Sequence, residues 1–269
     1  MIKDITFGQY YETNSKLHKL DPRTKIILLL LLLVFIFVCD NFLSLFLVAA
    51  FVFIAALISK IPFKIFLGNI KVILPVVIFT GIINLFYSGE SGEVLIYFWK
   101  LAITTAGVSR ALFMAFRIII LIFTSSVLTY TTTPNDLTDA IERLLMPLKF
   151  IGLGGAVHTV AMMMTIALRF IPTLVEETDK IMSAQKARGA DLENGKLLER
   201  IKALIPILIP LLISSVRRAY ELAEAMECRC YNGAGGRTRM KQLKFKIGDL
   251  ISVIISFVVC ALVLILNKF

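Results

Sequence analysis

Residues 26–59 read IILLLLLLVFIFVCDNFLSLFLVAAFVFIAALIS, and Asp40 is the one charged residue among them. A bilayer core needs about 20 apolar helical residues, fewer if the flanking residues snorkel. The 14 residues before Asp40 therefore make a short crossing, and a second apolar run follows at once. Asp21 and Pro22 suit the first turn of a helix. The stretch predicts a tight helical hairpin with Asp40 at the far face of a membrane.

Composition indicates that much of the chain contacts lipid. Hydrophobic residues make up 58% of the 269 residues, and the mean hydropathy is +0.83. A soluble domain is about 45 to 50% apolar. The formal net charge of +10 would also suit a nucleic-acid binder, but a multi-pass membrane protein collects Lys and Arg on its cytoplasmic side. We therefore expect a multi-pass protein of the cell membrane, in contact with the lipid bilayer, and no nucleic-acid partner.

Further apolar segments follow the hairpin. They cover residues 72–88, 111–133 (interrupted by Arg117) and 250–267. Together with the hairpin they predict about five transmembrane helices. We expect an N-terminal transmembrane region (1–131), a cytoplasmic region (132–246) and a C-terminal transmembrane helix (247–269).

The distribution of basic residues predicts the orientation. The N-terminal tail and the 60–71 connection are basic, whereas the loop at 89–99 contains two Glu and neither Lys nor Arg. Basic loops remain in the cytoplasm. The region 132–246, which holds 17 of the 29 basic residues, is therefore also predicted to be cytoplasmic. The N-terminus is then cytoplasmic and the C-terminus outside.

The region 132–246 predicts three helices. The first begins near Thr133 and Pro134 and is amphipathic. The second spans about residues 156–188 and the third about 196–229, each roughly 50 Å long. Both are apolar in their first halves and charged in their second halves. The predicted fold class is an all-α membrane protein with about five transmembrane helices and three cytoplasmic or interfacial coupling helices.

An alternative is that residues 156–175 and 203–216 also cross the membrane, which gives seven crossings. Arg169 and Lys202 leave these apolar pieces short, which favours the first interpretation. Prolines within the two long helices are expected to bend them. They are Pro172, Pro206 and Pro210.

The two long helices end in the same pattern. Residues 184–189 and 225–230 both read Ala-x-x-small-Arg-small, with Arg188 and Arg229 as the arginines. Small neighbours let a guanidinium reach into a groove while the backbone approaches closely. Two copies predict two similar partners. The simpler account is that cationic side chains favour helix C-termini.

No segment predicts a catalytic, ATP or metal site. The glycines at 152–155 and 233–236 lack the Lys and hydroxyl of a phosphate-binding loop. No order of Ser, His and Asp supports an enzyme, and the C-x-C pair of Cys228 and Cys230 has no further ligand nearby. We expect no bound cofactor or metal, so any ATP must be bound by other subunits.

Two further basic features each allow two interpretations. Arg110 and Arg117 lie seven residues apart on one face of a membrane helix, and they are either functional or structurally paired and snorkelling. The basic run from Arg237 to Lys246 either contacts anionic lipid or only keeps its segment in the cytoplasm.

Several stretches together resemble the transmembrane T component of energy-coupling factor (ECF) ABC transporters, in that family's order and spacing over nearly the whole chain. They are SKLHKLDPRTK (15–25), TPNDL (133–137), MPL (146–148), ALRFIP (167–172) and the two arginine motifs.

The resemblance implies partners and site residues. In that family the T component joins a substrate-binding membrane S component to two ABC-type ATPases. Apolar residues of the long helices, such as Met163 and Leu208, are implied to support the S component. Cys228 and Cys230 replace the family's Ala and Gly in the second motif, and the backbone geometry there stays open. The residues implied to dock on the ATPases are Ala187, Arg188, Gly189, Cys228, Arg229 and Cys230.

The resemblance thus implies a non-catalytic scaffold and coupling subunit of an ECF-type importer. It would transmit the ATP-driven motion of the two ATPases to the S component, for uptake of vitamins or related micronutrients. The alternative is a stand-alone secondary transporter that uses Arg110 and Arg117 as its substrate or ion site. A membrane enzyme is a second alternative, for which no catalytic cluster is visible.

Overall fold

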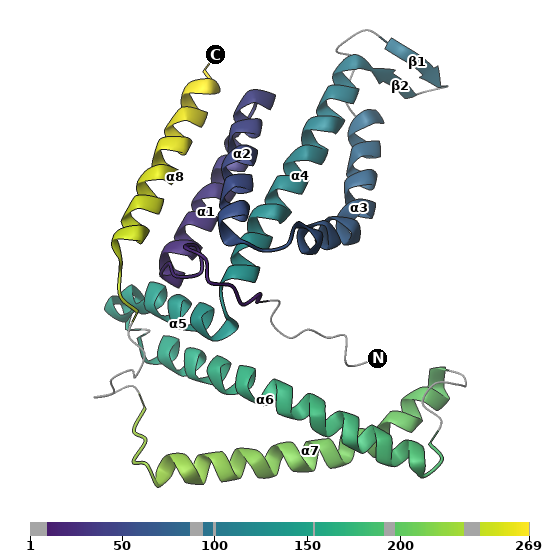
Figure 1. The fold of residues 1–269 in the computed structure, drawn as a ribbon. Helices are drawn as coiled ribbons and strands as arrows, with labels where there is room; N and C mark the ends of the chain where they lie inside the picture. The colour runs from purple at the N-terminus through teal and green to yellow at the C-terminus, as the bar shows by residue number, and fades with distance from the viewer. Residues whose placement is uncertain are drawn as a thin grey trace. The chain divides into compact units, whose positions relative to one another are not determined.

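A computed structural model of the chain describes residues 10–86, 94–98, 101–152, 154–190, 197–233 and 243–268. Helices dominate these ranges (Figure 1), which confirms the predicted all-α membrane class. The chain forms two compact units. The bundle unit lies within Gly8–Ala140 and Lys241–Phe269, and the long-helix unit lies within Ile141–Met240.

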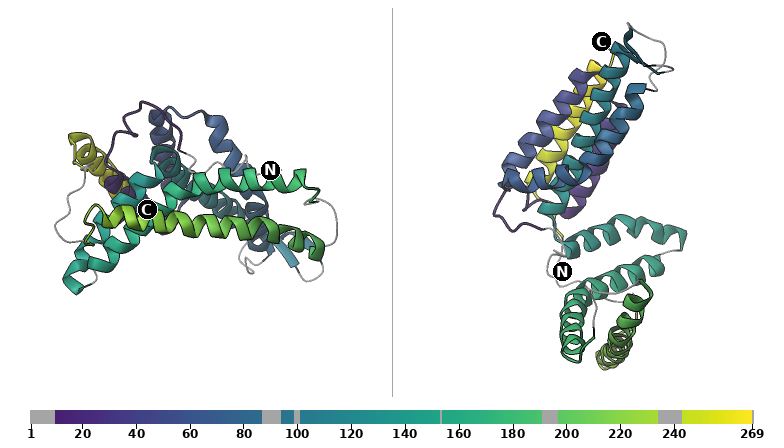
Figure 2. Two further views of the ribbon diagram at one scale, coloured as in Figure 1. Left: turned by 90° about the horizontal axis from the view of Figure 1, so that it is seen from below. Right: turned by 90° about the vertical axis from the view of Figure 1, so that its right-hand side faces the viewer.

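The described part of the bundle unit contains five long helices. They are α1 (Pro22–Val38), α2 (Phe42–Ser59), α3 (Phe63–Phe86), α4 (Thr105–Thr131) and α8 (Ile247–Leu266). Figures 1 and 2 show α1, α2, α4 and α8 side by side. The first two form the predicted hairpin, and Asp40 lies in the turn between them.

Five helices of the described chain are long and apolar enough to cross a membrane, but they are not the five predicted. Four are α2, α3, α4 and α8, and the fifth is α6 (Gly154–Ala187) of the long-helix unit. The 17 residues of α1 span only about 26 Å, slightly less than a hydrocarbon core. We retain α1 as a membrane helix because it packs against α4 and α8. The alternative in which residues 156–175 cross is compatible with the length and composition of α6.

A short β-hairpin departs from the predicted all-helical pattern. β1 (Val94–Phe98) and β2 (Leu101–Thr104) pair antiparallel, with Phe98 opposite Leu101. A short apolar run cannot be assigned to strand or helix from its periodicity alone. Glu90 and Glu93, which carry the prediction of an outer loop, lie outside the described residues.

The core of the bundle unit is apolar. Its completely buried side chains include Ile36, Leu45, Val48 and Val263. Phe66 of α3 packs against α4, with its ring centroid 4.7 Å from that of Phe123 and 5.3 Å from that of Tyr130. Large apolar side chains such as Phe46 and Ile254 are exposed on the outer helix faces. Such faces require lipid or a partner to cover them.

A buried carboxylate joins the beginnings of α1 and α8. Asp249 is 1% exposed and accepts hydrogen bonds from the Asp21 N–H (2.7 Å), the Thr24 hydroxyl (3.0 Å) and the Lys246 N–H (2.7 Å). Asp21 caps α1 as predicted, since its side chain accepts the Arg23 N–H at 2.9 Å. Charge-assisted hydrogen bonds therefore tie the two helix ends together.

Polar side chains also form hydrogen bonds at the opposite end of the bundle unit, where α1 and α8 end. The Asn267 side chain donates to the Val38 carbonyl at 2.6 Å and accepts the Asp40 N–H at 3.3 Å. Arg117 of α4 donates to the Cys39 carbonyl, beyond the last residue of α1. This contact supports the structural interpretation of Arg117, because the guanidinium satisfies a carbonyl that the helix leaves unpaired.

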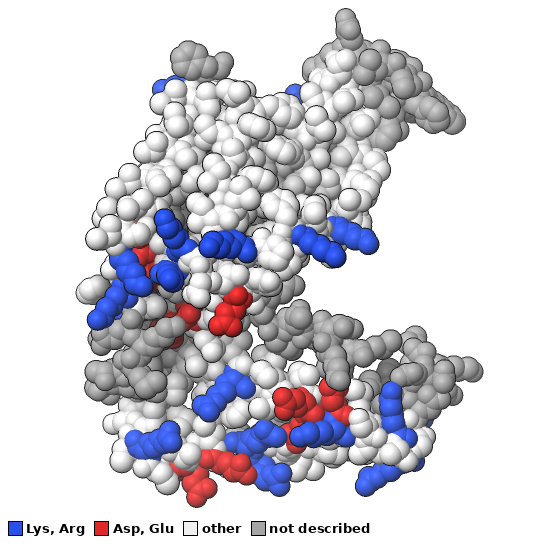
Figure 3. Space-filling view, in the orientation of Figure 1, with Lys and Arg blue, Asp and Glu red and all other residues white. Residues whose placement is uncertain are grey.

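Basic side chains gather at the end of the bundle unit where α1 begins. The Thr13 hydroxyl donates to the Ser59 carbonyl at 3.1 Å, so the end of α2 lies beside the N-terminal segment. Lys60 follows α2 at this end, and Lys64 lies in the first turn of α3. Figure 3 shows Lys and Arg as a band along the edge of the apolar surface. Lys and Arg gathered at one end of a membrane bundle are typical of its cytoplasmic end.

The long-helix unit follows α5 (Pro134–Leu145), whose first half belongs to the bundle unit. The N-terminus of α5 forms as predicted, since the Thr133 hydroxyl accepts the Asp136 N–H at 3.1 Å. A 3₁₀ turn, η2 (Met146–Ile151), leads to α6 and then to α7 (Leu197–Glu227). α7 changes direction near its beginning in Figure 1, and its two prolines, Pro206 and Pro210, account for the bend.

We predict that Asp249→Ala destabilises the bundle unit by about 3 kcal/mol or more. The change leaves the N–H groups of Asp21 and Lys246 without their buried acceptor, whereas the Thr24 hydroxyl still donates to the Asp21 carbonyl at 2.6 Å. Asp249→Asn retains one acceptor oxygen and should cost less. The midpoint of thermal unfolding, followed by circular dichroism in detergent, measures both effects.

The matched control is Asp40→Ala, because the Asp40 side chain is exposed. It should change the midpoint little. Equal midpoints for Asp249→Ala and Asp40→Ala would show that the Asp249 cluster contributes nothing to stability.

Candidate functional site: two matched helix ends

α6 ends in a Schellman motif, in which backbone N–H groups satisfy the last carbonyls of the helix. The Gly189 N–H donates to the Lys186 carbonyl at 3.0 Å, and the Ala190 N–H donates to the Gln185 carbonyl at 3.0 Å. Gly189 has a φ of 87°, which glycine adopts without strain. Arg188 is the residue immediately before this left-handed position.

α7 ends in the same motif. The Cys230 N–H donates to the Glu227 carbonyl at 2.8 Å, and the Tyr231 N–H donates to the Met226 carbonyl at 3.1 Å. Cys230 has a φ of 54°, so a non-glycine residue adopts the left-handed conformation here. The sequence left this geometry open. Arg229 therefore occupies the same place in its helix end as Arg188, despite the replacement of glycine by cysteine.

Both arginines are presented to the outside of the chain. Since backbone N–H groups already bond the last carbonyls, neither arginine is needed to cap its helix. Within the described residues neither guanidinium makes a hydrogen bond or an ion pair. Each offers five N–H donors in a planar fork. The last three residues of both motifs are all exposed, namely Ala187, Arg188, Gly189, Cys228, Arg229 and Cys230.

The two motifs lie at opposite ends of one helix pair. The Gln185 amide donates to the Pro206 carbonyl at 3.4 Å, and Ser214 donates to Glu177, so α6 and α7 run antiparallel. Figure 1 shows α6 and α7 ending on opposite sides of the unit. The helical rise from Pro206 to Arg229 is about 35 Å. A single small groove cannot take both motifs.

A polar cluster holds α6 against α7. Glu177 accepts the Ser214 hydroxyl and forms an ion pair with Arg218 at 2.5 Å. This cluster was not predicted from the sequence, because its contacts join residues 37 and 41 positions apart. The available signal was that Ser214 and Arg218 share a helix face at i,i+4 spacing.

Exposed apolar side chains occur in the first halves of both α6 and α7, which lie toward opposite ends of this antiparallel pair. Met163 is 56% exposed and Leu208 is 57% exposed. Neighbouring exposed apolar residues are Val160, Met164, Leu204, Ile205, Ile209, Leu212 and Ile213. Exposed apolar side chains clustered in this way mark contacts with a membrane or with another protein.

A family model and several similar proteins agree on the family to which this chain is related. The CbiQ family, described as "Cobalt transport protein", matches residues 13–241. The "Energy-coupling factor transporter transmembrane protein EcfT" of Ruminiclostridium cellulolyticum is 55% identical over 251 residues, which cover 93% of this chain and 92% of the relative. Proteins with the same description from Clostridium kluyveri (50% identity, 98% and 96% covered) and Bacillus subtilis (40% identity, 98% of both covered) are also similar.

We predict opposite effects of substitution at the two left-handed positions. Gly189→Val should strain the backbone and weaken the end of α6 by about 1 to 2 kcal/mol, although open space surrounds the position. Cys230→Gly should relieve strain and strengthen the end of α7 by up to about 1 kcal/mol. Hydrogen exchange of the Ala190 and Tyr231 amides measures these effects.

Gly155→Ala is the control, because Gly155 lies in the first turn of α6 with open space around it. It should leave exchange at both helix ends unchanged. Unaltered exchange of the Ala190 amide in Gly189→Val would contradict the Schellman assignment.

Proposed function

This chain belongs to the CbiQ family and is a multi-pass transmembrane component of an energy-coupling factor transporter, and we propose that it couples two ATPase subunits to a substrate-binding S component. The observation that carries the proposal is the pair of matched, exposed arginine motifs at opposite ends of α6 and α7. Each motif docks in a groove of one ABC-type ATPase. The ATPases bind and hydrolyse the ATP.

The geometry of the helix ends supports docking over simple capping. The Schellman hydrogen bonds leave each guanidinium available for a partner's carboxylates or carbonyls. A separation of about 35 Å along α7 suits two receptors, one for Arg188 and one for Arg229. The small residues beside each arginine leave room for a groove wall. The same backbone geometry at both ends suits two similar subunits.

The S component lies across the helix pair and covers both apolar regions, the one around Met163 of α6 and the one around Leu208 of α7. Lipid covers whatever part of these regions the S component leaves open. The Glu177, Ser214 and Arg218 cluster holds α6 to α7, so a displacement of either docked end moves both helices. The motion of two ATPases then reaches the S component through a rigid helix pair.

The S component determines the cargo, which we propose is a vitamin or a related micronutrient. We also propose that the N-terminus is cytoplasmic and the C-terminus outside. The band of Lys and Arg at the beginning of α1 supports this orientation (Figure 3). It puts the beginnings of α1 and α8 at the cytoplasmic face, and Asn267 at the outer face.

A stand-alone secondary transporter is the alternative, and it requires Arg110 and Arg117 at a substrate or ion site. The Arg117 guanidinium instead donates to the Cys39 carbonyl and lies 4.7 Å from the centroid of the Phe113 ring. Because these contacts give Arg117 a structural role, they favour the coupling function over a stand-alone transporter. The paired arginine motifs also have no role in a stand-alone transporter.

We predict that Met163→Asp or Leu208→Asp releases the S component while the ATPases stay bound. A charge on this apolar surface is costly to bury. Copurification of S component and ATPases with the tagged chain distinguishes the two contacts. Met163→Leu and Leu208→Met are the matched controls and should retain both partners. Equal loss of both partners from membrane-inserted Asp variants would argue against this division of roles.

We predict that Arg188→Ala or Arg229→Ala weakens ATPase binding by roughly 1.5 to 3 kcal/mol, or about tenfold to more than a hundredfold. Lysine should rescue only partly, because it lacks the planar fork. The double Ala variant should reach the membrane in normal amount and lose both ATPase copurification and uptake.

Arg217→Ala is the control, because it removes one exposed arginine of α7 outside the motifs. It should retain ATPase binding and uptake. If the double variant also retains both, the arginines are ordinary helix-end charges and the proposed docking is wrong.

A further inference from the structure

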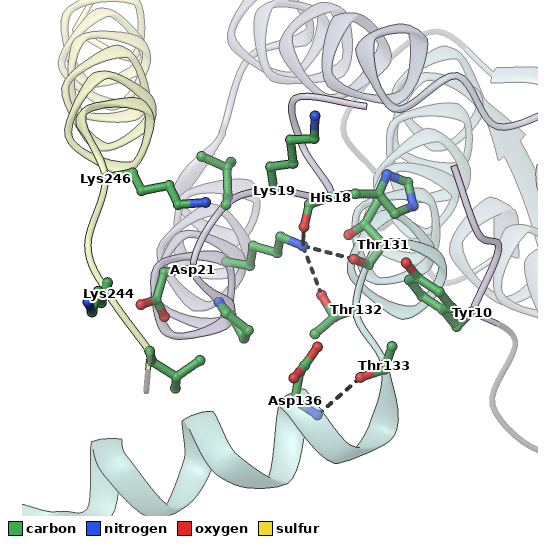
Figure 4. A pocket seen from close by; sticks show the side chains of 14 residues that line it. Tyr10, His18, Lys19, Asp21, Thr131, Thr132, Thr133, Asp136, Lys244 and Lys246 are labelled. Atoms are coloured by element: carbon green, nitrogen blue, oxygen red, sulfur yellow. Dashed lines mark hydrogen bonds between the residues drawn. The ribbon is translucent and has the colours of Figure 1, made fainter. Parts of the chain in front are cut away.

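A polar pocket of about 330 Å³ lies at the basic end of the bundle unit. It is formed where α1 and α8 begin and where α4 ends. Lysines line it from two separate parts of the chain (Figure 4). They are Lys19 and Lys25 at the beginning of α1, and Lys244 and Lys246 before α8. The proposed contacts with the ATPases and the S component do not use this pocket.

Contacts of Arg23 hold the two lysine-bearing segments together. The Arg23 guanidinium lies 4.3 Å from the centroid of the Phe245 ring and donates to the Leu243 carbonyl at 3.1 Å. It also pairs with Asp21 at 2.8 Å. Lys244 and Lys246 are thereby kept beside the beginning of α1. The lysine cluster is thus a product of the fold, since residues 19 and 246 are far apart in sequence.

Positive charge in the pocket exceeds negative charge. Two carboxylates line the pocket, Asp21 and Asp136, and Arg23 already pairs with Asp21. Lys25 is 7% exposed, and its amine donates to the Thr131 carbonyl at 2.8 Å rather than to a carboxylate. The lining therefore contains four lysines and two carboxylates, and a bound anion would offset this excess of positive charge.

The other three lysines are available to a ligand. Lys19, Lys244 and Lys246 are exposed, and their ammonium groups make no hydrogen bond or ion pair with any residue that the structure describes. In Figure 4 the Lys246 side chain extends toward the centre of the pocket, Asp136 rises from α5 below it, and the Lys19 amine points away from Asp136. His18 adds no charge at neutral pH, because burial lowers the pKa of its imidazole.

We propose that this pocket binds the phosphate group of an anionic phospholipid headgroup. An exposed apolar stripe begins next to Lys246 and continues along α8. Its residues are Ile247, Leu250, Ile251 and Ile254, which share one helix face at i, i+3, i+4 and i+7. The lysines bind the phosphate while an acyl chain lies along this stripe. A free phosphate ion would use the lysines and leave the stripe unused.

The location of the pocket suits this ligand. Basic residues at the cytoplasmic membrane surface attract anionic lipids, and each Lys near the surface contributes severalfold to binding. A headgroup held here contacts the ends of three bundle helices at once. The lipid therefore stabilises the bundle unit at the boundary from which the chain continues into α5.

The test compares three forms of the full chain in non-ionic detergent by native mass spectrometry. They are the wild type, a pocket variant (Lys19→Gln, Lys244→Gln, Lys246→Gln) and a charge-matched control (Lys60→Gln, Lys64→Gln, Lys71→Gln). Each is titrated with phosphatidylglycerol, phosphatidylcholine or inorganic phosphate. Lys25 is left intact because it is buried.

We expect the wild type to prefer phosphatidylglycerol, the pocket variant to lose roughly tenfold to a hundredfold of that affinity, and the control to lose less than about threefold. Circular dichroism confirms that each variant is folded. Equal losses in the two variants would overturn the proposal, as would equal binding of phosphatidylcholine. Inorganic phosphate that binds the pocket as tightly as phosphatidylglycerol would assign it to a free anion instead.

Discussion

Lipid contains no water to bond with backbone groups, and this constraint organises the bundle unit. Each membrane segment is therefore a helix, and polar side chains occur where helices end. Asp249 bonds to backbone N–H groups at the beginnings of α1 and α8. Asn267 and Arg117 bond to carbonyls at the other end of α1. The apolar side chains between these ends need only pack together or face lipid.

The same constraint separates the two tasks of the chain. Charged motifs that would bind water-soluble partners are costly among lipid tails, and the two arginine motifs lie at the ends of long helices outside the bundle unit. α6 and α7 combine an apolar first half with a charged second half. The cluster of Glu177, Ser214 and Arg218 makes them one mechanical element. Each charged helix end is thus mechanically connected to the exposed apolar side chains of the same helix pair.

Local features of the fold were predictable from the sequence because their signals are local. The cap at Asp21, the turn at Asp40 and the beginning of α5 at Thr133 each depend on a few consecutive residues. The β-hairpin was missed, because its short apolar strands resemble part of a helix. The left-handed backbone of Cys230 follows from the end of α7 rather than from the residue type. The lysine pocket was also missed, because it joins residues before α1 with residues before α8.

The central claim is that one copy of this chain holds two ATPase subunits at separate helix ends. Native mass spectrometry of the complex, purified from its native membrane through a tag on this chain, tests that claim most directly. The account predicts an assembly of one 30.1 kDa copy of this chain, two ABC-type ATPase subunits and one further membrane protein. A chain that is isolated without ATPases from membranes active in transport, or with a single ATPase subunit, would contradict it.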